Sequence, residues 1–454
     1  MSNYLINKYN VAGPRYTSYP TVPYWDLGNF SIEEYKKSLK RSFSESNQSE
    51  GISLYLHLPF CESLCTFCGC NKRITKRHEV ESPYINAILD EWEMYLELLE
   101  EKPVIKEIHL GGGTPTFFSP ENLKLLIQGL FKNATKAEGF DFSFEGHPNN
   151  TQKGHLEALY EAGFKRVSYG VQDYNMTVQQ AIHRIQPFVN VKKATELARE
   201  IGYTSVGHDI IFGLPFQTVE HIRTTIEKTK ELMPDRIAFY SYAHVPWIKG
   251  NGQRGFNEED LPTADVKREM YETGKKMLAE AGYVEIGMDH FALRSDSLYK
   301  AVEEKKMHRN FMGYTHSKTK VMIGLGVSAI SDSWSGFAQN VKTLEEYYEL
   351  LEKREFPLYR GHILTEEDEK LRKHILNLMC NLETSWEDES SYFPELPDVL
   401  IRLKEMESDG LIEIEKDRLI IKEEGRPFVR NVCMAFDLLL QRSKPETQLF
   451  SMTV

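Results

Sequence analysis

The chain has 454 residues, of which 41% are hydrophobic and 27% charged, a balance typical of a folded globular protein and not of a disordered or membrane-spanning one. Its formal net charge of -12 disfavours nucleic acid or anionic lipid as partners, because both bind through summed lysine and arginine contacts. No apolar run approaches the ~20 residues that cross a bilayer, and the first residues lack a secretory signal. We therefore expect a cytoplasmic protein with no membrane partner.

Strands and helices are predicted to alternate from residue 46 onward. Two of the helices are opened by Ser-Pro pairs, at 82–83 and 119–120, which supply an N-cap and a first helical residue. The strands are expected at 53–58, 104–110, 142–145, 166–170, 209–213 and 236–242. Six such units imply an α/β fold, an incomplete version of the eight-unit barrel, with functional residues at the carboxyl ends of the strands.

The pattern changes after about residue 360. We expect helices at 366–383, 397–409 and 428–440, and two short strands at 411–414 and 418–421. This pattern resembles a mainly helical domain with a winged-helix character, but eight acidic residues between 405 and 424 disfavour DNA binding. The chain thus divides into an N-terminal arm (1–45), a barrel with its extension (46–360) and a C-terminal domain (361–454).

Four of the six cysteines lie within ten residues, which is too crowded for an ordinary disulfide framework. The spacing of Cys61, Cys65 and Cys68 lets one loop reach three corners of a cubic iron-sulfur cluster, because thiolates are the ligands that iron and sulfide prefer. The fourth iron stays open if Cys70 points elsewhere. A closed zinc site is the alternative, although structural zinc usually takes its ligands as two separated pairs.

The segment GGGTPT, at 111–116, follows the second predicted strand. Glycines let the backbone approach a ligand closely. Taken alone, the pattern favours a plain tight turn, but its position at the carboxyl end of a strand, one unit after the cysteines, favours ligand binding. The later strand ends also carry polar residues: Glu145, Gln172 with Arg184 downstream, and Asp209. Each taken singly is a candidate structural residue. Together at one barrel mouth they predict a pocket for a small zwitterionic, nucleotide-like ligand.

These motifs are similar to those of a known family. The CxxxCxxC, GGGTPT, GVQ and GLP elements resemble the radical S-adenosylmethionine (SAM) enzymes. Within them, the chain resembles the oxygen-independent coproporphyrinogen III oxidases through GPRYTSYPT at 13–21, the extended CxxxCxxCxC, GVQDYN, SYAHVP, GMDHFA, HRNFMGYT and GLGVSAIS. The resemblance extends from about residue 7 to RNVCMAFD, and it implies an incomplete (β/α)6 radical SAM barrel.

The resemblance also implies the site residues. Cys61, Cys65 and Cys68 would hold a [4Fe-4S] cluster, and Cys70 would be needed for activity without being a ligand. Two SAM molecules are implied. The positions that match the first SAM site are Tyr55, Gly112, Glu145 and Ile330. Those that match the second are Phe67, Gly113, Thr114, Gln172, Arg184, Asp209 and Ala243.

The implied activity is the anaerobic oxidative decarboxylation of two propionates of coproporphyrinogen III to vinyls, which gives protoporphyrinogen IX for haem biosynthesis. A 5'-deoxyadenosyl radical made from SAM would remove hydrogen from the propionate β-carbon. A monomer is implied, with a reducing electron donor such as flavodoxin or ferredoxin and an electron acceptor as further partners. The alternatives are haem chaperones and haem-degrading relatives, which generally lack the Gly69-Cys70 extension and the GPRYTSYPT arm.

An anionic substrate requires local cations on this acidic chain. Lys72, Arg73, Lys76 and Arg77 follow the cysteines and pair well with carboxylates, although a solvated basic loop is the alternative. Further candidates are His290, His308 and Arg309. The chain departs from the family pattern at 146–149, where Gly-His-Pro-Asn replaces an apolar residue and Asp-Pro-Arg, and at His208 and His316.

Overall fold

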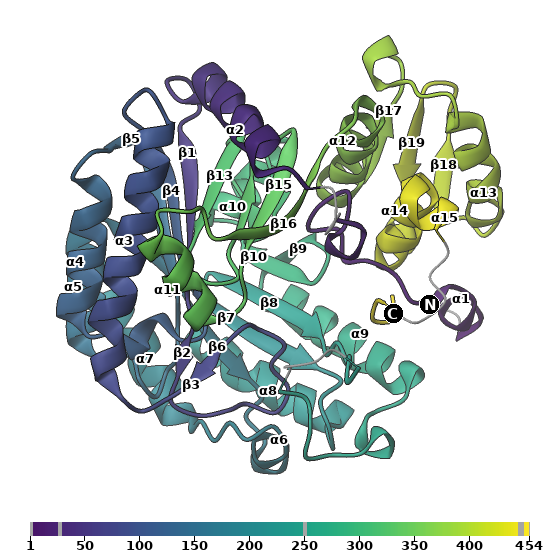
Figure 1. The fold of residues 1–454 in the computed structure, drawn as a ribbon. Helices are drawn as coiled ribbons and strands as arrows, with labels where there is room; N and C mark the ends of the chain where they lie inside the picture. The colour runs from purple at the N-terminus through teal and green to yellow at the C-terminus, as the bar shows by residue number, and fades with distance from the viewer. Residues whose placement is uncertain (1–2, 26–29, 248–251, 444–448, 454) are drawn as a thin grey trace.

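The computed structural model describes residues 3–25, 30–247, 252–443 and 449–453. Its centre is a sheet of 12 strands (Figure 1). Six adjacent strands run parallel in chain order: β1 (Ile52–Leu58), β4 (Val104–Gly112), β5 (Thr135–Gly146), β6 (Phe164–Gln172), β7 (Ser205–Phe212) and β8 (Arg236–Ser241). The six predicted units are confirmed. β1 and β8 do not pair with each other, so the barrel is incomplete, as expected.

Helices connect these strands and cover the outer face of the sheet (Figure 1). Ser119 begins α4 as predicted, because its hydroxyl accepts a hydrogen bond from the Asn122 N–H. The predicted start at Ser82-Pro83 was wrong, because α3 begins at Glu81 and contains both residues. The helices of this layer are α3 (Glu81–Leu98), α4 (Pro120–Phe131), α5 (Lys153–Ala162), α6 (Met176–Ala181), α7 (Phe188–Ile201), α8 (Val219–Leu232) and α9 (Ala264–Glu280). No helix in the described part of the chain is both long and apolar enough to cross a membrane.

Both edges of the six-stranded core carry further strands. Beside β1 lie β13 (Val321–Leu325), β14 (Ile330–Asp332), β15 (Gly336–Asn340) and β16 (Leu358–Ile363), and beside β8 lie β10 (His290–Leu293) and β9 (Tyr283–Gly287). Only β13 among them is parallel to its core neighbour. β16 crosses the domain boundary expected at residue 360 and remains paired with β15 as far as Ile363.

Short elements join these parts. They are α10 (Ser297–Glu303), α11 (Leu344–Glu352), the strand pair β2 (Phe60–Cys61) and β3 (Arg73–Ile74), the pair β11 (His308–Asn310) and β12 (Gly313–Thr315), and 3-10 turns at Val22–Tyr24, His78–Val80, Pro115–Phe117, Glu258–Asp260, Glu389–Ser391 and Glu423–Phe428. β2 and β3 lie directly beyond the end of β1, where the cysteines are found.

The N-terminal arm contacts both halves of the molecule. Its second helix, α2 (Ile32–Ser46), buries Tyr35, Leu39 and Phe43 in the core of the barrel. The first helix, α1 (Asn3–Tyr9), and the following segment instead pack Tyr9 and Tyr16 into the C-terminal core. The arm therefore joins the two cores.

The C-terminal domain contains α12 (Glu366–Asn381), β17 (Glu383–Ser385), α13 (Leu396–Ser408), β18 (Ile412–Ile414), β19 (Arg418–Ile421), α14 (Val429–Phe436) and α15 (Leu438–Arg442). The sequence did not predict β17, which completes a three-stranded sheet. The prediction of a single last helix at 428–440 was wrong, because the structure has two helices there. The helix breaks at Asp437, whose carboxylate accepts the Leu440 N–H and starts α15.

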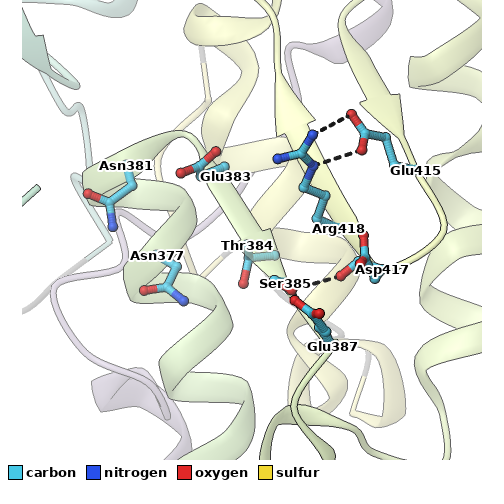
Figure 2. Close-up of a pocket in the computed structure, with 9 residues that line it drawn as sticks. All are labelled: Asn377, Asn381, Glu383, Thr384, Ser385, Glu387, Glu415, Asp417 and Arg418. Atoms are coloured by element: carbon cyan, nitrogen blue, oxygen red, sulfur yellow. Dashed lines mark hydrogen bonds and ion pairs between the residues drawn. The ribbon is translucent and has the colours of Figure 1, made fainter.

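A pocket of about 500 Å³ lies between α12 and this small sheet (Figure 2). Its one lining guanidinium, on Arg418, is held by both oxygens of Glu415 at 2.8 and 3.0 Å. Glu383, Glu387 and Asp417 also line it. The pocket therefore offers an acidic surface, opposite in charge to one that binds phosphates.

Candidate active site

The cysteine loop forms one wall of a cavity of about 520 Å³ at the carboxyl ends of the parallel strands. Cys61, Cys65, Cys68 and Cys70 all line it as free thiols. Among the residues described, no three His, Cys, Asp or Glu side chains converge on a point where a single metal ion would bind. The thiols instead face a shared open space, which is the arrangement that a multinuclear cluster needs.

Polar groups contact the sulfur atoms. The Thr114 hydroxyl is hydrogen-bonded to Cys61 Sγ at 3.4 Å, and Arg184 Nη1 donates to Cys65 Sγ at 3.7 Å. The hydrogen bond from the Cys70 side chain lowers the pKa of Cys68 to about 6, and the same contact raises the pKa of Cys70. Cys68 is thus the partner that ionises, as a metal ligand must.

The glycine loop fits tightly against the strand that carries the cysteines. Gly113 N–H donates to Leu58 O at 2.8 Å, and a Cβ on Gly113 would lie 2.6 Å from the Pro59 carbonyl. Gly112 has a φ of +114°, and a Cβ there would lie 2.8 Å from the His57 ring. These two positions require glycine, and both face the cavity.

Glu145 is the penultimate residue of β5 and faces the cavity. It lies next to His109 of β4, whose Nε2 is 3.5 Å from the Glu145 Oε1. Burial acts to raise the pKa of Glu145, but the His109 hydrogen bond and charge and the Gly112 N–H outweigh it, so the pKa is lowered. Tyr55 lies beside the same carboxylate, since a Cβ on Gly111 would contact Tyr55 at 3.1 Å and Glu145 at 3.2 Å. Glu145 is therefore an anion at neutral pH.

Asp209 supplies a second carboxylate, from β7. Burial and the negative charge of Glu145 raise its pKa to about 7, although the Ser168 hydroxyl donates to it at 2.9 Å. One fixed anion and one acid that is half protonated near neutral pH therefore share the cavity. A cationic ligand placed between them would favour ionisation of Asp209.

Gln172 and Arg184 meet above the end of β6. A Cβ on Gly170 would lie 2.7 Å from Gln172 Nε2 and 2.9 Å from Arg184 Nη2, and Arg184 Nη2 donates to Gly170 O at 2.7 Å. Gln172 Oε1 and Arg184 Nε are buried without a hydrogen-bond partner. Because buried polar atoms are normally paired, these two atoms are available to a ligand.

Of the remaining predicted site residues, Phe67 lines the cavity, whereas Ile330 and Ala243 do not. Ile330 begins β14, and its carbonyl lies against Gly324, which pairs with Tyr55 across β1 and β13. Phe67 and Ala243 are joined by the Gln253 amide, which donates to their carbonyls at 3.2 and 2.7 Å. The fold thus brings residues 55 to 330 to one end of the barrel.

Comparison with known proteins agrees with this geometry. Residues 55–229 match the Radical SAM superfamily. The oxygen-independent coproporphyrinogen III oxidase of Helicobacter pylori is 37% identical over 96% of this chain and 96% of its own length. That of Escherichia coli is 36% identical over 99% of this chain and 98% of its own. The chain belongs to this family. The solved structure of coproporphyrinogen III oxidase from Escherichia coli, described as a radical SAM enzyme, matches with a TM-score of 0.88 and 34% identity over 94% of this chain and 98% of that chain.

Family membership confirms the expected resemblance, the fold class and the class of enzyme, a radical SAM oxidoreductase. The superfamily implies SAM and a [4Fe-4S] cluster. The described residues fit both groups. Three free thiols face one cavity, and two carboxylates, an unpaired amide oxygen and an unpaired guanidinium nitrogen face or border it.

The residues expected to meet substrate carboxylates separate in the structure. Lys72 lines the cavity and donates to the Cys68 and Cys70 carbonyls, both at 3.2 Å. Arg73, Lys76 and Arg77 are exposed and do not line it. These three residues therefore fit the alternative, a solvated basic loop, better than they fit a substrate subsite.

The other substrate candidates lie elsewhere. His290 lines a smaller cavity of about 140 Å³ inside the barrel, which also reaches Glu145 and Asp209. His308 lines a separate cavity beside α12. Arg309 donates to the carbonyls of Arg15 and Tyr16 at 3.3 Å and so holds the arm. Of the three, only His290 borders the carboxylate pair.

Some of the residues that depart from the family pattern line the main cavity, and others lie away from it. His147 and Asn149 line the main cavity, and burial with the charge of Arg184 lowers the pKa of His147 to about 3, so this ring is neutral. Asn149 Nδ2 donates to Ile185 O at 2.9 Å, which fixes the loop beside Arg184. His208 is buried and hydrogen-bonded to Thr195, and His316 lies 3.7 Å from Asp141.

Sequence reasoning missed His57 and His109. His57 supports the glycine loop and its Nε2 contacts Asn71 O at 2.9 Å, while His109 supports Glu145. A signal was present: the predicted strands SLYLHL and VIKEIHL each contain a histidine next to their end. In the parallel register His109 lies opposite Tyr55, two residues from His57.

Proposed function

We propose that this chain decarboxylates two propionates of coproporphyrinogen III oxidatively to vinyls and so makes protoporphyrinogen IX without oxygen. The observation that carries the proposal is one cavity with three free thiols, a glycine loop and two carboxylates, in a chain similar over its whole length to oxidases of that name. The names of these relatives favour an oxidase over a haem chaperone or a haem-degrading enzyme. Cys70 and the arm motif, which such proteins generally lack, support the same choice.

When bound, the cluster and SAM would supply an electron and the acceptor for a propionate hydrogen atom. Cys61, Cys65 and Cys68 would hold the cluster, and the hydrogen bonds from Thr114 and Arg184 would orient two of these thiolates. The carboxylates of Glu145 and Asp209 would hold cationic groups, and the unpaired Arg184 Nε would take a carboxylate.

We assign two SAM molecules to this space. The first would contact Tyr55, Gly112, Glu145 and Ile330, and the second Phe67, Gly113, Thr114, Gln172, Arg184, Asp209 and Ala243. The support is that two carboxylates from different strands border a cavity of about 520 Å³, with unpaired Gln172 and Arg184 atoms on the Asp209 side. Cys70 would act on substrate or on the second SAM, not as a cluster ligand.

The test is anaerobic turnover of coproporphyrinogen III by the reconstituted protein, with the product identified by mass. We expect a product lighter by two CO2 and four hydrogen atoms, and none when SAM is omitted. The same sample should hold about four irons and four sulfides per chain. Haem binding without any change in porphyrinogen mass would support the chaperone alternative, and one tight zinc without sulfide would contradict the radical reaction.

A further inference from the structure

The exposed basic segment after the cysteines is hydrogen-bonded to the backbone of Cys61, one of the proposed cluster ligands. β2 and β3 pair in parallel, with Cys61 opposite Ile74. Thr75 N–H donates to Cys61 O at 2.9 Å, and Arg73 N–H donates to Pro59 O at 2.8 Å. Cys61 thus faces the cavity with its thiol, while its backbone is hydrogen-bonded to a surface strand.

This strand and the residues just after it form an exposed surface, which we call the basic strand surface and which consists of Arg73, Ile74, Lys76 and Arg77. The side chain of Arg73 is 60% exposed, and Ile74 is 41% exposed at its centre. Arg73 lies 3.5 Å from Glu345, whereas Lys76 and Arg77 form no ion pair with any described residue. The surface therefore has an apolar centre and cations that are free to meet a partner.

The positive charge of this surface is opposite in sign to the net charge of the whole chain. With a net charge of -12, the chain as a whole repels acidic proteins. Because salt screens charges beyond about 8–10 Å, a partner that comes close responds mainly to the local cations. An acidic protein would therefore be oriented toward the strand that is bonded to Cys61.

We propose that the basic strand surface docks an acidic, one-electron donor protein and that electrons enter the cluster on the Cys61 side. This inference rests on the proposed function, which needs an external reductant. In the step, one electron leaves the reduced centre of the donor and enters the cluster, so the donor is oxidised and the cluster reduced by one electron each. None of the four residues of this surface lines the substrate cavity, so docking there would leave the cavity open.

The test compares the wild type with an Arg73→Gln/Lys76→Gln/Arg77→Gln variant, both reconstituted anaerobically. Photoreduced flavodoxin is the probe, and cluster bleaching is followed by stopped flow without substrate. We expect the second-order rate constant at low salt to fall about tenfold and its salt dependence to flatten, because surface charges act on association. Calorimetry with oxidised flavodoxin should show an affinity that is weaker by a similar factor.

The controls separate docking from other effects. Lys132→Gln/Lys193→Gln/Lys416→Gln removes the same charge at exposed lysines elsewhere and should behave as the wild type. Iron content and reduction by dithionite should be equal in all three proteins.

Equal flavodoxin rate constants in wild type and variant, or no flavodoxin binding to the wild type, would overturn the proposal. A raised KM of the variant for coproporphyrinogen in dithionite-driven turnover would show instead that this surface binds the substrate. Reduction by flavodoxin with no turnover would count only against the proposed function.

Discussion

Cys70 lies on the cavity wall, and its side chain contacts Cys68 through a hydrogen bond. It lies two residues beyond Cys68, the last of the three proposed cluster ligands. A fourth thiolate would close the iron that SAM needs, so the proposed role of Cys70 is in catalysis.

We expect Cys70→Ser to keep the iron and sulfide of the wild type and to bind SAM, but to form no protoporphyrinogen. The hydroxyl preserves size and polarity but does not supply thiol chemistry. Iron is counted on the same anaerobic samples that are used for turnover. Loss of iron in the variant would indicate that all four cysteines are ligands. Normal turnover would show that Cys70 has no role in the mechanism.

Arg184 contacts Cys65 and Gly170 and has one unpaired nitrogen. We expect Arg184→Ala to weaken SAM binding by about tenfold or more, because a charge-assisted hydrogen bond contributes ~1.5–3 kcal/mol. Equilibrium dialysis should give about two SAM per wild-type chain and a lower stoichiometry in the variant. Arg184→Lys, with equal iron content, tests whether charge alone is sufficient. Unchanged affinity and stoichiometry would leave Arg184 a structural residue.

At the scale of elements, one buried carboxylate links α3 to the edge of the sheet. Glu91 accepts hydrogen bonds from Gly326 N–H at 2.8 Å, the Tyr347 hydroxyl at 2.6 Å and Asn340 Nδ2 at 2.7 Å. Burial raises the pKa of Glu91 from 4.5 to about 7 despite these donors. Its contacts join α3, the segment after β13, β15 and α11.

This pKa predicts a specific pH dependence of stability. Because the folded pKa exceeds the unfolded one, the stabilisation is complete below 4.5 and is lost as the pH rises through about 7. We expect Glu91→Gln to remove this loss, which amounts to about 3 kcal/mol. Urea unfolding of the protein without cluster at several pH values measures it. Glu93→Gln, an exposed carboxylate on the same helix, should leave the wild-type slope unchanged.

At the scale of the whole molecule, the two ends of the chain are fastened together. Ala12 bridges to Met452, and the termini lie close together near α1 (Figure 1). Arg430 of α14, buried between them, donates to the carbonyls of Pro14 at 2.8 Å and Met452 at 2.9 Å, and to that of Gly13. One guanidinium therefore holds the arm on the C-terminal domain.

We expect Arg430→Met to destabilise the fold by about 3 kcal/mol, since several buried carbonyls lose their donor. Amide hydrogen exchange should quicken most at residues 9–20 and 449–453. Arg402→Met in the same domain, an exposed arginine with a single carbonyl partner, should have little effect. Unchanged exchange in the arm of the Arg430 variant would contradict the role assigned to this guanidinium.

The sequence alone determined the features that rest on local patterns. The six parallel strands, the Ser119 cap and the cysteine and glycine loops follow from periodicity, capping and spacing within a few residues. Local signals also placed Glu145 and Gln172 close to strand ends, whereas Asp209 lies inside β7, and the parallel order brings all three to one face of the barrel.

Only the tertiary structure decided what depends on contacts between distant segments. The edge strands β9, β10 and β13 to β16 are short, and they join the core sheet through only two pairings with strands further away in the chain, β13 with β1 and β10 with β8. Spacing alone did not separate Lys72, which faces the cavity, from Arg73, Lys76 and Arg77, which do not, because the path of this segment depends on contacts with residues before the cysteine loop, such as the pairing of Arg73 and Ile74 with β2. His57 and His109 acquired their roles in the same way: a strand pattern shows which residues alternate, but the neighbours across the sheet decide which groups meet.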